Sequence, residues 1–199
     1  MKLYCTSYST FSRRVRIALL EKSLVADEVE VGPEDRARPE YRAINPYGRI
    51  PALVDGDVVL FESTAILTYL EEKHPEPALL PADPAGRARV AMLTKLCDLE
   101  FTPHAVRIQR PKRMLPEEQW DRAAMATTRE PLERHLAFLE RELDGREYLV
   151  GDRFSHADLA YLPFLHFHGL LEVALPPKVA AWWERLDARD SSRATVPTK

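Results

Sequence analysis

The chain has 199 residues, 45% of them hydrophobic and 30% charged, a length that suits one or two domains with a buried core. Its 28 Lys and Arg residues nearly balance 31 Asp and Glu residues, which argues against general binding to nucleic acid or to an anionic membrane. With only two cysteines, Cys5 and Cys97, a disulfide framework is excluded. We find neither a run of about 20 apolar residues nor an export signal, and therefore expect a cytoplasmic globular protein.

Residues 1–75 show strand and helix patterns in alternation. Four short segments predict strands: Lys2–Cys5, Val25–Val31, Ala52–Val54 and Val58–Phe61. A helix pattern follows the first segment, an irregular stretch separates the second from the third, and another helix pattern follows the fourth. Asp55-Gly56 is a typical hairpin turn between the last two strands. Since a strand–helix–strand unit favours a parallel pair, we predict a small mixed sheet covered by helices.

A proline-rich stretch separates this region from the rest of the chain. Residues 74–84 contain four prolines in eleven residues, too many for a helix or a central strand. We therefore predict an α/β domain over residues 1–75, a linker over residues 76–85, and an all-α domain over residues 86–199.

Only helical signals follow the linker. Apolar residues recur at helical spacing from Val90 to Phe101, from Leu132 to Leu143 and around Trp182-Trp183. Pro103 should kink or end the first of these helices. The sequence from Ser155 to Asp158 is a variant of the capping box, which predicts that a further helix starts there.

Three short segments of the first domain carry groups that could bind a ligand. Ser9–Ser12 lies at the expected start of the first helix, where free backbone N–H groups and the helix dipole stabilise an anion. Asn45–Leu53 contains Pro51 directly before a strand, and Glu62-Ser63 offers a carboxylate and a hydroxyl at the start of the next helix. Each segment also has a structural interpretation, namely helix capping for the first and third and an ordinary strand start for Pro51.

Together these segments resemble the cytosolic glutathione S-transferases over nearly the whole chain. The motifs that carry the resemblance are LYCTSYSTFSRRVRIALLEK, NPYGRIPALVDGD, FESTAI and GDRFSHADL, in that order. The resemblance implies a thioredoxin-like N-terminal domain, an all-helical C-terminal domain with the second-substrate pocket, and a homodimer. It also implies that glutathione is the co-substrate, that no metal takes part, and that the second substrate is a small electrophile.

The resemblance assigns glutathione contacts to a set of residues in the first domain. Pro51 would be a cis-proline, and its neighbour Ile50 would pair through its backbone with the cysteinyl part of glutathione. Glu62 and Ser63 match the residues that hold the γ-glutamyl end. Arg49 stands where the family often has a Lys or Gln near the glycyl end.

The residue that activates the thiol is expected near the first helix, because the superfamily uses Tyr, Ser or Cys there. Ser9 matches the serine position of the zeta-, theta- and phi-like groups. Its hydroxyl would donate a hydrogen bond to the glutathione thiolate. Tyr4, Tyr8, Thr10 and Ser12 remain alternatives for this role.

Several other reactive residues have a simpler interpretation. Cys5 falls within the first predicted strand and Cys97 on an apolar helix face, so we predict that both are buried. His166 and His168 are split across a helix, a spacing that offers no metal site. Arg107 and its basic neighbours are expected to form a solvated helix end.

The predicted function is conjugation or transfer of glutathione to small electrophiles. A zeta-like maleylacetoacetate isomerase is one subtype, although Ser9–Ser12 departs from the SSC-type sequence of that group. The alternative from another class is a non-catalytic protein, similar to the stringent starvation proteins, that binds RNA polymerase. One fold can host both kinds of function, and the sequence does not identify the electrophile.

Overall fold

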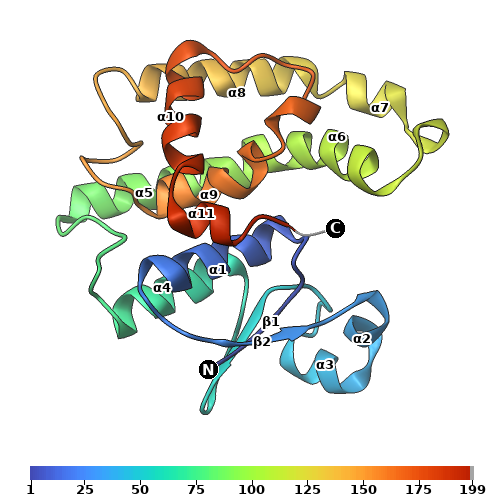
Figure 1. The fold of residues 1–199 in the computed structure, drawn as a ribbon, viewed down its shortest axis with the longest axis vertical. Helices are drawn as coiled ribbons and strands as arrows, with labels where there is room; N and C mark the ends of the chain where they lie inside the picture. The colour runs from blue at the N-terminus through green and yellow to red at the C-terminus, as the bar shows by residue number, and fades with distance from the viewer. Residues whose placement is uncertain (198–199) are drawn as a thin grey trace. The chain divides into compact units, whose positions relative to one another are not determined.

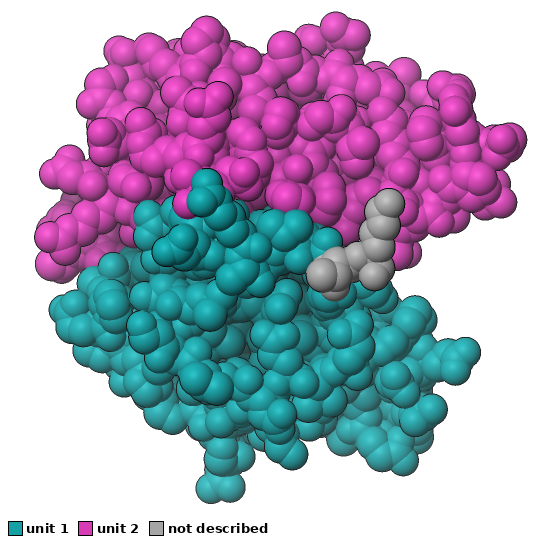
Figure 2. Space-filling model, in the orientation of Figure 1, with its two compact units in different colours: residues 1–79, 189–199 teal, residues 80–188 magenta. Residues whose placement is uncertain are grey.

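The computed structural model describes residues 1–197 and divides them into two compact units, which Figure 2 colours separately. Unit 1 contains Met1–Leu79 together with the described residues from Arg189 onward, and unit 2 is Leu80–Ala188. The predicted helical domain extends to residue 199, so its end lies outside the described residues. The described residues from Arg189 onward belong to the α/β unit instead, because polar contacts with α1 hold them there.

Unit 1 is built on a four-stranded mixed sheet with the strand order β2-β1-β3-β4 (Figure 1). Strands β1 and β2 are parallel and β3 and β4 form an antiparallel hairpin, as the sequence predicts. Strand β3 is also antiparallel to β1, a pairing that the sequence did not predict. The elements of unit 1 are β1 Lys2–Cys5, α1 Thr10–Glu21, β2 Asp27–Glu30, α2 Pro33–Ala37, α3 Pro39–Ile44, β3 Ala52–Asp55, β4 Val58–Phe61, α4 Ser63–Lys73 and α11 Asp190–Ala194.

The core of unit 1 lies between the sheet and the pair of helices α1 and α4. Leu3 and Leu53 on the strands, Val15 on α1, and Ile66 and Leu70 on α4 are all fully buried in one cluster. Each such side chain stabilises the fold by about 1.5–3 kcal/mol relative to an exposed one. The first turns of α1 and α4 are thereby held in fixed positions against the sheet.

The segment predicted to be irregular between the second and third strands contains two short helices. Helix α2 begins at Pro33 and helix α3 at Pro39, and each proline occupies the first helical position. Proline fits there because the first N–H of a helix has no partner within the helix and the fixed φ angle is already helical. The prolines therefore start helices here, although in sequence they indicate breaks.

Two charged residues of α1 bind the end of the chain to unit 1. The buried Arg13 guanidinium donates to the Ser192 carbonyl at 3.0 Å and to Thr195 Oγ1 at 3.2 Å. At the other end of α1, the Glu21 carboxylate accepts two hydrogen bonds from Arg189, at 2.8 and 2.6 Å. These contacts explain why the last helix, α11, belongs to unit 1. They are polar, so a hydrophobic periodicity in the sequence does not predict them.

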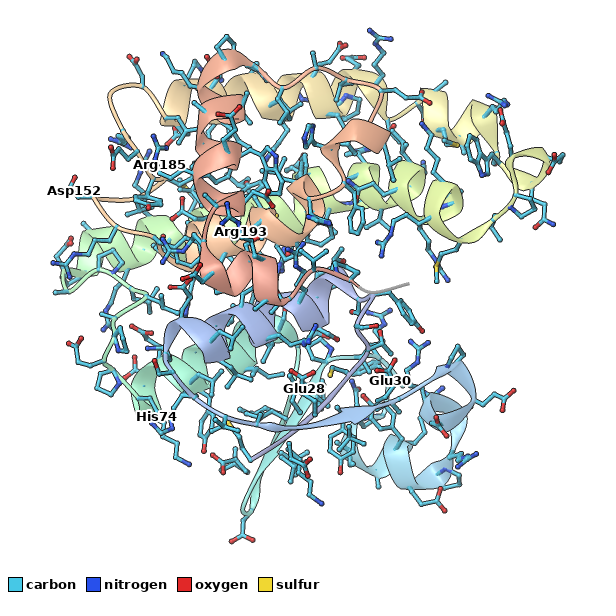
Figure 3. The ribbon with its side chains drawn as sticks, in the orientation of Figure 1. Glu28, Glu30, His74, Asp152, Arg185 and Arg193 are labelled. Carbon is cyan, nitrogen blue, oxygen red and sulfur yellow. The ribbon has the colours of Figure 1, made fainter. Side chains whose placement is uncertain are left out.

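The beginning of the proline-rich segment is tied to unit 1 by a buried ion pair. Lys22 Nζ lies 2.6 Å from Glu71 and also donates to the carbonyls of His74 and Pro77, at 2.7 and 2.8 Å. Glu71 in turn accepts from the Leu79 N–H at 3.0 Å. Figure 3 labels His74 at the start of this segment. The segment is therefore extended but anchored as far as Leu79.

Unit 2 is all-helical, which confirms the predicted class of the second half. Its helices are α5 Pro84–Leu96, the π-helix η1 Cys97–Phe101, α6 Thr102–Met114, the 3₁₀ helix η2 Glu117–Gln119, α7 Arg122–Ala126, α8 Arg129–Glu142, α9 His156–Leu165, the 3₁₀ helix η3 His168–Leu170 and α10 Pro177–Asp187. Among residues 1–197, no helix is both long enough and apolar enough to span a bilayer.

The first long helix of unit 2 continues past Pro103 instead of ending there. Helices α5 and α6 follow one another through the π-helical turn of η1, and Pro103 lies in the first turn of α6. The wider π-helical turn changes the hydrogen-bond pattern just before the proline, and such turns recur at functional sites. Of the two predicted outcomes at Pro103, a kink or a helix end, the helix end is therefore wrong. Helix α6 also continues beyond Pro111, to Met114.

The predicted capping box at the start of α9 is confirmed. Ser155 Oγ accepts from the Ala157 N–H at 3.3 Å, while the Asp158 carboxylate accepts from the Ser155 N–H at 2.9 Å. The same carboxylate also accepts from the Leu149 N–H at 2.9 Å and from the Trp182 indole N–H at 3.0 Å. Asp158 thus joins α9, α10 and the preceding loop through one buried group.

A buried histidine in unit 2 should make stability depend on pH. His135 Nε2 lies 2.9 Å from the Tyr161 hydroxyl, beside the Phe101 ring. Burial lowers the pKa of His135 from 6.5 to about 4, with smaller contributions from His104 and Arg134. Between these two pH values the unfolded chain binds a proton that the folded chain does not, so stability falls as pH is lowered.

We expect the free energy of unfolding to decrease by about 3 kcal/mol as the pH is lowered from 6.5 to 4, because of His135 alone. His135→Phe should remove that part of the pH dependence, as measured by urea unfolding at several pH values. The comparison uses the slope against pH, because the substitution also changes the packing around Tyr161. An unchanged slope in the variant would contradict the assignment.

Candidate functional site

Ser9 lies between β1 and α1 and is the N-cap of α1. Its backbone is extended, with φ −79° and ψ 119°, and its Oγ accepts a hydrogen bond from the Ser12 N–H at 3.2 Å. Within residues 1–197 this hydroxyl donates no hydrogen bond, and the residue is half-buried. Capping and ligand binding are therefore compatible, since capping uses an acceptor lone pair and leaves the hydroxyl proton available.

The loop before β3 is held through the Arg49 carbonyl. That oxygen accepts from the Tyr41 hydroxyl at 2.6 Å and from Asn45 Nδ2 at 2.8 Å. Burial raises the pKa of Tyr41 to about 12, so its hydroxyl remains a donor at neutral pH. The following Ile50–Pro51 peptide bond is cis in the structure.

Gly48 makes the turn in this loop possible. Its φ of 59° lies in the left-handed region, and a Cβ there would approach the Arg36 carbonyl oxygen to 2.9 Å and the Arg42 side chain to 2.8 Å. Only glycine avoids both problems. The turn directs the chain from α3 back to the start of β3.

Glu62 joins β4 to α4 in a strained conformation. Its φ of 72° is in the left-handed region, which costs a residue with a side chain about 1–3 kcal/mol. Its carbonyl accepts from the Ile66 N–H at 3.1 Å, but its carboxylate does not cap the helix. Within the described part of the chain this carboxylate has no partner and is exposed. The strained backbone of Glu62 therefore places a carboxylate that is unpaired within residues 1–197 beside the first turn of α4.

Ser63 follows as the first residue of α4, and it is buried with 4% of its surface exposed. The N–H groups of a first helical turn have no partner inside the helix, and the helix dipole favours an anion there. The Glu62 carboxylate can therefore bind a cationic group, and the Ser63 hydroxyl with the free N–H groups of the first turn of α4 can bind an anionic group beside it.

A small cavity of about 100 Å³ in unit 1 brings these segments together. The residues that line it are Phe11, Asn45, Arg49, Ile50, Pro51, Glu62 and Ser63. Four of them, Arg49, Ile50, Glu62 and Ser63, are the residues predicted to contact glutathione, and a fifth, Pro51, is the predicted cis-proline. Phe11 and Asn45 were not assigned, although Asn45 opens the NPYGRIPAL motif and Phe11 follows Thr10 at the start of α1.

The alternatives to Ser9 occupy different surroundings. Ser12 is fully buried, and Thr10 is the first residue of α1. Tyr4 lies in β1 with its ring 5.9 Å from the Tyr41 ring, and Tyr8 is half-buried in the loop before α1. Neither Ser9 nor any of these four residues lines the cavity. Ser9 is two residues from the lining residue Phe11 in the sequence, but it lies outside the cavity itself.

Cys5 is buried in β1, which confirms its interpretation as a strand residue. Its Sγ lies 3.9 Å from the carboxylate of Glu28, a β2 residue labelled in Figure 3. Burial, followed by the nearby negative charge of Glu28, raises the pKa of the Cys5 thiol to about 12. Cys97 is buried as well. Across residues 1–197, no group of three or more His, Cys, Asp and Glu residues is arranged to hold a metal ion.

Cys5 should therefore react very slowly with alkylating reagents in the folded protein. With a pKa of about 12, about one thiol in ten thousand is ionised near pH 8. We expect the rate of iodoacetamide labelling at Cys5, followed by peptide mass spectrometry, to rise with pH without levelling off up to about pH 11. The urea-unfolded chain serves as the control, and a plateau near pH 9 in the folded protein would contradict the assignment.

The mixed four-stranded sheet and the helical unit define a two-part α/β and all-α protein with a small ligand cavity at the start of α4. Two family models match the chain: the N-terminal domain of glutathione S-transferase over residues 3–78, and the C-terminal domain of glutathione S-transferase over residues 96–190. The chain therefore belongs to the cytosolic glutathione S-transferase superfamily, and its N-terminal unit is thioredoxin-like.

Similar proteins carry different names. Glutathione S-transferase 3 of Zea mays is 37% identical and covers 98% of this chain and 93% of its own length. A stringent starvation protein A homolog of Coxiella burnetii is 34% identical, over 90% of this chain and 81% of that protein. The maleylacetoacetate isomerase of Pseudomonas aeruginosa is 37% identical, over 88% and 84%.

Among solved structures, the theta class glutathione S-transferase of Xanthomonas axonopodis pv. citri superposes with a TM-score of 0.91. It is 29% identical, the match covers 100% of this chain and 97% of that one, and that structure has glutathione bound. The likeness extends over both units of the chain.

The strain at Glu62 leads to a prediction that separates binding from stability. Glu62→Gly should raise the free energy of unfolding of the protein by about 1 kcal/mol, because glycine adopts a positive φ without strain. The same change should weaken glutathione binding about tenfold, measured by calorimetry, because the carboxylate is lost.

Ser23 provides a matched control, since it also has a left-handed φ, of 53°, and lies in unit 1 away from the cavity. Ser23→Gly should stabilise the protein without changing glutathione affinity. Glu62→Gln should weaken binding without stabilising the protein. Unchanged affinity in both Glu62 variants would show that the carboxylate does not contact the ligand.

Proposed function

We propose that the protein is a glutathione transferase that conjugates or transfers glutathione to small electrophiles. The observation that carries the proposal is the cavity of unit 1, where Ile50-Pro51, Arg49 and Glu62-Ser63 line one space next to the helix that Ser9 caps. These residues come from two separate parts of the chain, and family membership favours the same ligand for them.

The charges at the cavity fit the γ-glutamyl end of glutathione. Glu62 offers an uncommitted carboxylate to the α-ammonium group, and Ser63 with the first turn of α4 offers N–H and O–H donors to the α-carboxylate. The enclosed volume of about 100 Å³ is small for a tripeptide, so we expect it to enclose only part of the ligand. The Ile50 backbone is the proposed partner of the cysteinyl part, and the exposed Arg49 that of the glycyl carboxylate.

The proposed role of Ser9 is electrostatic. Glutathione supplies a thiol whose ionised form attacks the electrophile, and a thiol with a pKa of about 8.5 is mostly protonated at neutral pH. Lowering this pKa by about two units requires roughly 2.7 kcal/mol. The hydroxyl proton of Ser9, which has no acceptor within the described residues, and the N-terminus of α1 are together suited to supply it.

A maleylacetoacetate isomerase is a subtype of this proposal, favoured by the similarity to the enzyme of Pseudomonas aeruginosa. Thr10-Phe11 departs from the SSC-type sequence of the zeta-like isomerases. We therefore favour general transferase activity over isomerase activity. Phe11 lines the cavity, so this departure changes the shape and polarity of the site itself. Assays of glutathione conjugation and of maleylacetoacetate isomerisation on the same preparation distinguish the two.

The second candidate is a non-catalytic protein that binds RNA polymerase, favoured by the similarity to the Coxiella burnetii homolog. Retention on immobilised glutathione, followed by conjugation of an aryl halide, separates this candidate from the first. Absence of both retention and turnover would favour the binding protein. With either function, family membership leads us to propose a homodimer in the cytoplasm.

Ser9→Ala should lower turnover at neutral pH more than it weakens glutathione binding. Most proposed binding contacts are at the two ends of the tripeptide, whereas the hydroxyl meets only the sulfur. Loss of a charge-assisted hydrogen bond predicts a decrease of roughly tenfold to 150-fold in rate. The defect should shrink as pH rises, because bulk solvent then ionises the thiol without help.

Thiolate absorbance in the glutathione complex, titrated against pH, provides the direct measurement. The thiol pKa should rise in Ser9→Ala and remain unchanged in the matched variants Tyr4→Phe, Tyr8→Phe and Thr10→Val. A rise in one of those variants alone would transfer the role to that residue. If none of the four changes the thiol pKa, the proposed transferase mechanism is wrong.

A further inference from the structure

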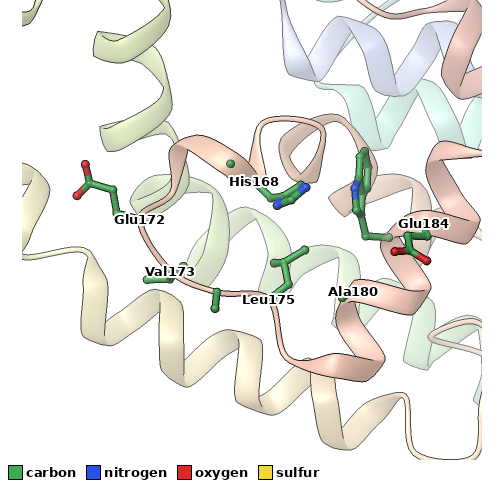
Figure 4. Close-up of a pocket in the computed structure, with 9 residues that line it drawn as sticks. His168, Glu172, Val173, Leu175, Ala180 and Glu184 are labelled. Carbon is green, nitrogen blue, oxygen red and sulfur yellow. The ribbon is translucent and has the colours of Figure 1, made fainter.

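Unit 2 contains a separate cavity of about 470 Å³, within the range typical of small-molecule sites. It lies between the segment that follows α9 and one face of α10, and Figure 4 shows its lining. Ala180, Trp183 and Glu184 are three and four residues apart, so they share that helix face. The segment that follows α9 contributes His168 and Leu175 to the lining.

The aromatic part of the cavity is organised around Trp183. Its ring lies 5.7 Å from the His168 ring at an interplanar angle of 61°, an edge-to-face arrangement. Trp183 is half-buried, unlike its fully buried neighbour Trp182. The His166 ring also lies edge-to-face with Trp183, at 6.3 Å and 69°. Because Trp183 is half-buried, part of its indole stays exposed, and an indole face attracts cations more strongly than other aromatic rings do.

The charge of the cavity is negative. None of its lining residues is Lys or Arg, while Glu172 and Glu184 both belong to it. Glu172 is already paired with Lys112, and in Figure 4 its side chain points away from His168. Glu184 is exposed, and within residues 1–197 its carboxylate makes no hydrogen bond or ion pair. The positions three and four residues from it hold only Ala and Asp, so its own helix offers no basic partner.

The nearby basic side chains are engaged elsewhere. Lys112 Nζ donates to the Leu170 carbonyl at 3.0 Å as well as to Glu172, and the Arg113 guanidinium lies 3.8 Å from the centre of the Phe167 ring. An uncommitted carboxylate beside a partly uncovered indole is the combination that recognises organic cations.

We propose that this cavity binds a small organic cation of the arylalkylammonium type. The ammonium group lies against Glu184 and the indole of Trp183, and the apolar body contacts Leu175 and Ala180. This site is independent of the proposed glutathione site, because every residue in it belongs to unit 2.

The test uses ¹⁵N-labelled protein with saturating glutathione, at about pH 8, where an alkylammonium ion keeps its proton. The indole N–H signals of the three tryptophans are followed during titration with 2-phenylethylammonium, and Trp183→Phe assigns the signal of Trp183. We expect a saturable shift of the Trp183 signal at millimolar concentration. The neutral 2-phenylethanol and the anionic phenylacetate should bind at least about fivefold more weakly.

Glu184→Gln should weaken the binding of 2-phenylethylammonium about three- to fivefold, because the charge is lost while the shape is kept. Glu118→Gln makes the same change in net charge at an exposed site outside the cavity and should have no effect. An unmoved Trp182 signal in Glu184→Gln checks that the fold is intact. Equal binding of the alcohol, equal weakening in both variants, or no movement of the Trp183 signal would each overturn the proposal.

Discussion

The pairing register of the sheet is the constraint on which the site depends. Tyr4 on β1 pairs with Ala52 on β3, and Ala52 pairs in turn with Phe61 on β4. Because β3 is antiparallel to both neighbours, the end of β1, the start of β3 and the end of β4 meet at one end of the sheet. The loop with Ser9, the cis Ile50–Pro51 bond and the Glu62 turn leave the sheet at that end. A slip of one residue would turn every strand side chain to the other face and separate these groups.

The N-termini of two helices, α1 and α4, lie at the same end of the sheet. Helix α1 begins after the Ser9 loop and α4 begins at Ser63, so both present free N–H groups and the positive ends of their dipoles nearby. Their positions are held from behind by the buried core and, for α1, by the contacts of Arg13 and Glu21 with the end of the chain. The left-handed Glu62 is tolerated because this surrounding structure leaves the turn no relaxed alternative.

The proteins similar to this chain include transferases, an isomerase and a stringent starvation protein homolog. One fold can therefore carry several functions, so we infer catalysis from the site and not from the fold. Two groups of the site, the Ser9 hydroxyl proton and the Glu62 carboxylate, have no partner within the described residues. In unit 2 the same criterion, an uncommitted charged group in a cavity, singles out Glu184.

The sequence by itself determined the class of the fold, the hairpin and the capping box at Ser155. These features depend on periodicity, turn residues and capping residues, all of which are local patterns along the chain. The resemblance of their motifs to the family assigned four further residues to the ligand, namely Arg49, Ile50, Glu62 and Ser63. Phe11 and Asn45 also lie in these motifs but were not assigned to the site, because their place in the cavity depends on which loops the sheet register brings together.

Only the tertiary structure decided the remaining features. Pro33 and Pro39 start helices, and Pro103 lies within a continuous helical segment, because hydrogen bonding around a proline determines whether it breaks a helix. Helix α11 and its flanking residues belong to unit 1 through polar contacts with Arg13 and Glu21. Polar contacts between residues more than 160 positions apart follow no hydrophobic period, so no pattern along the sequence reveals them.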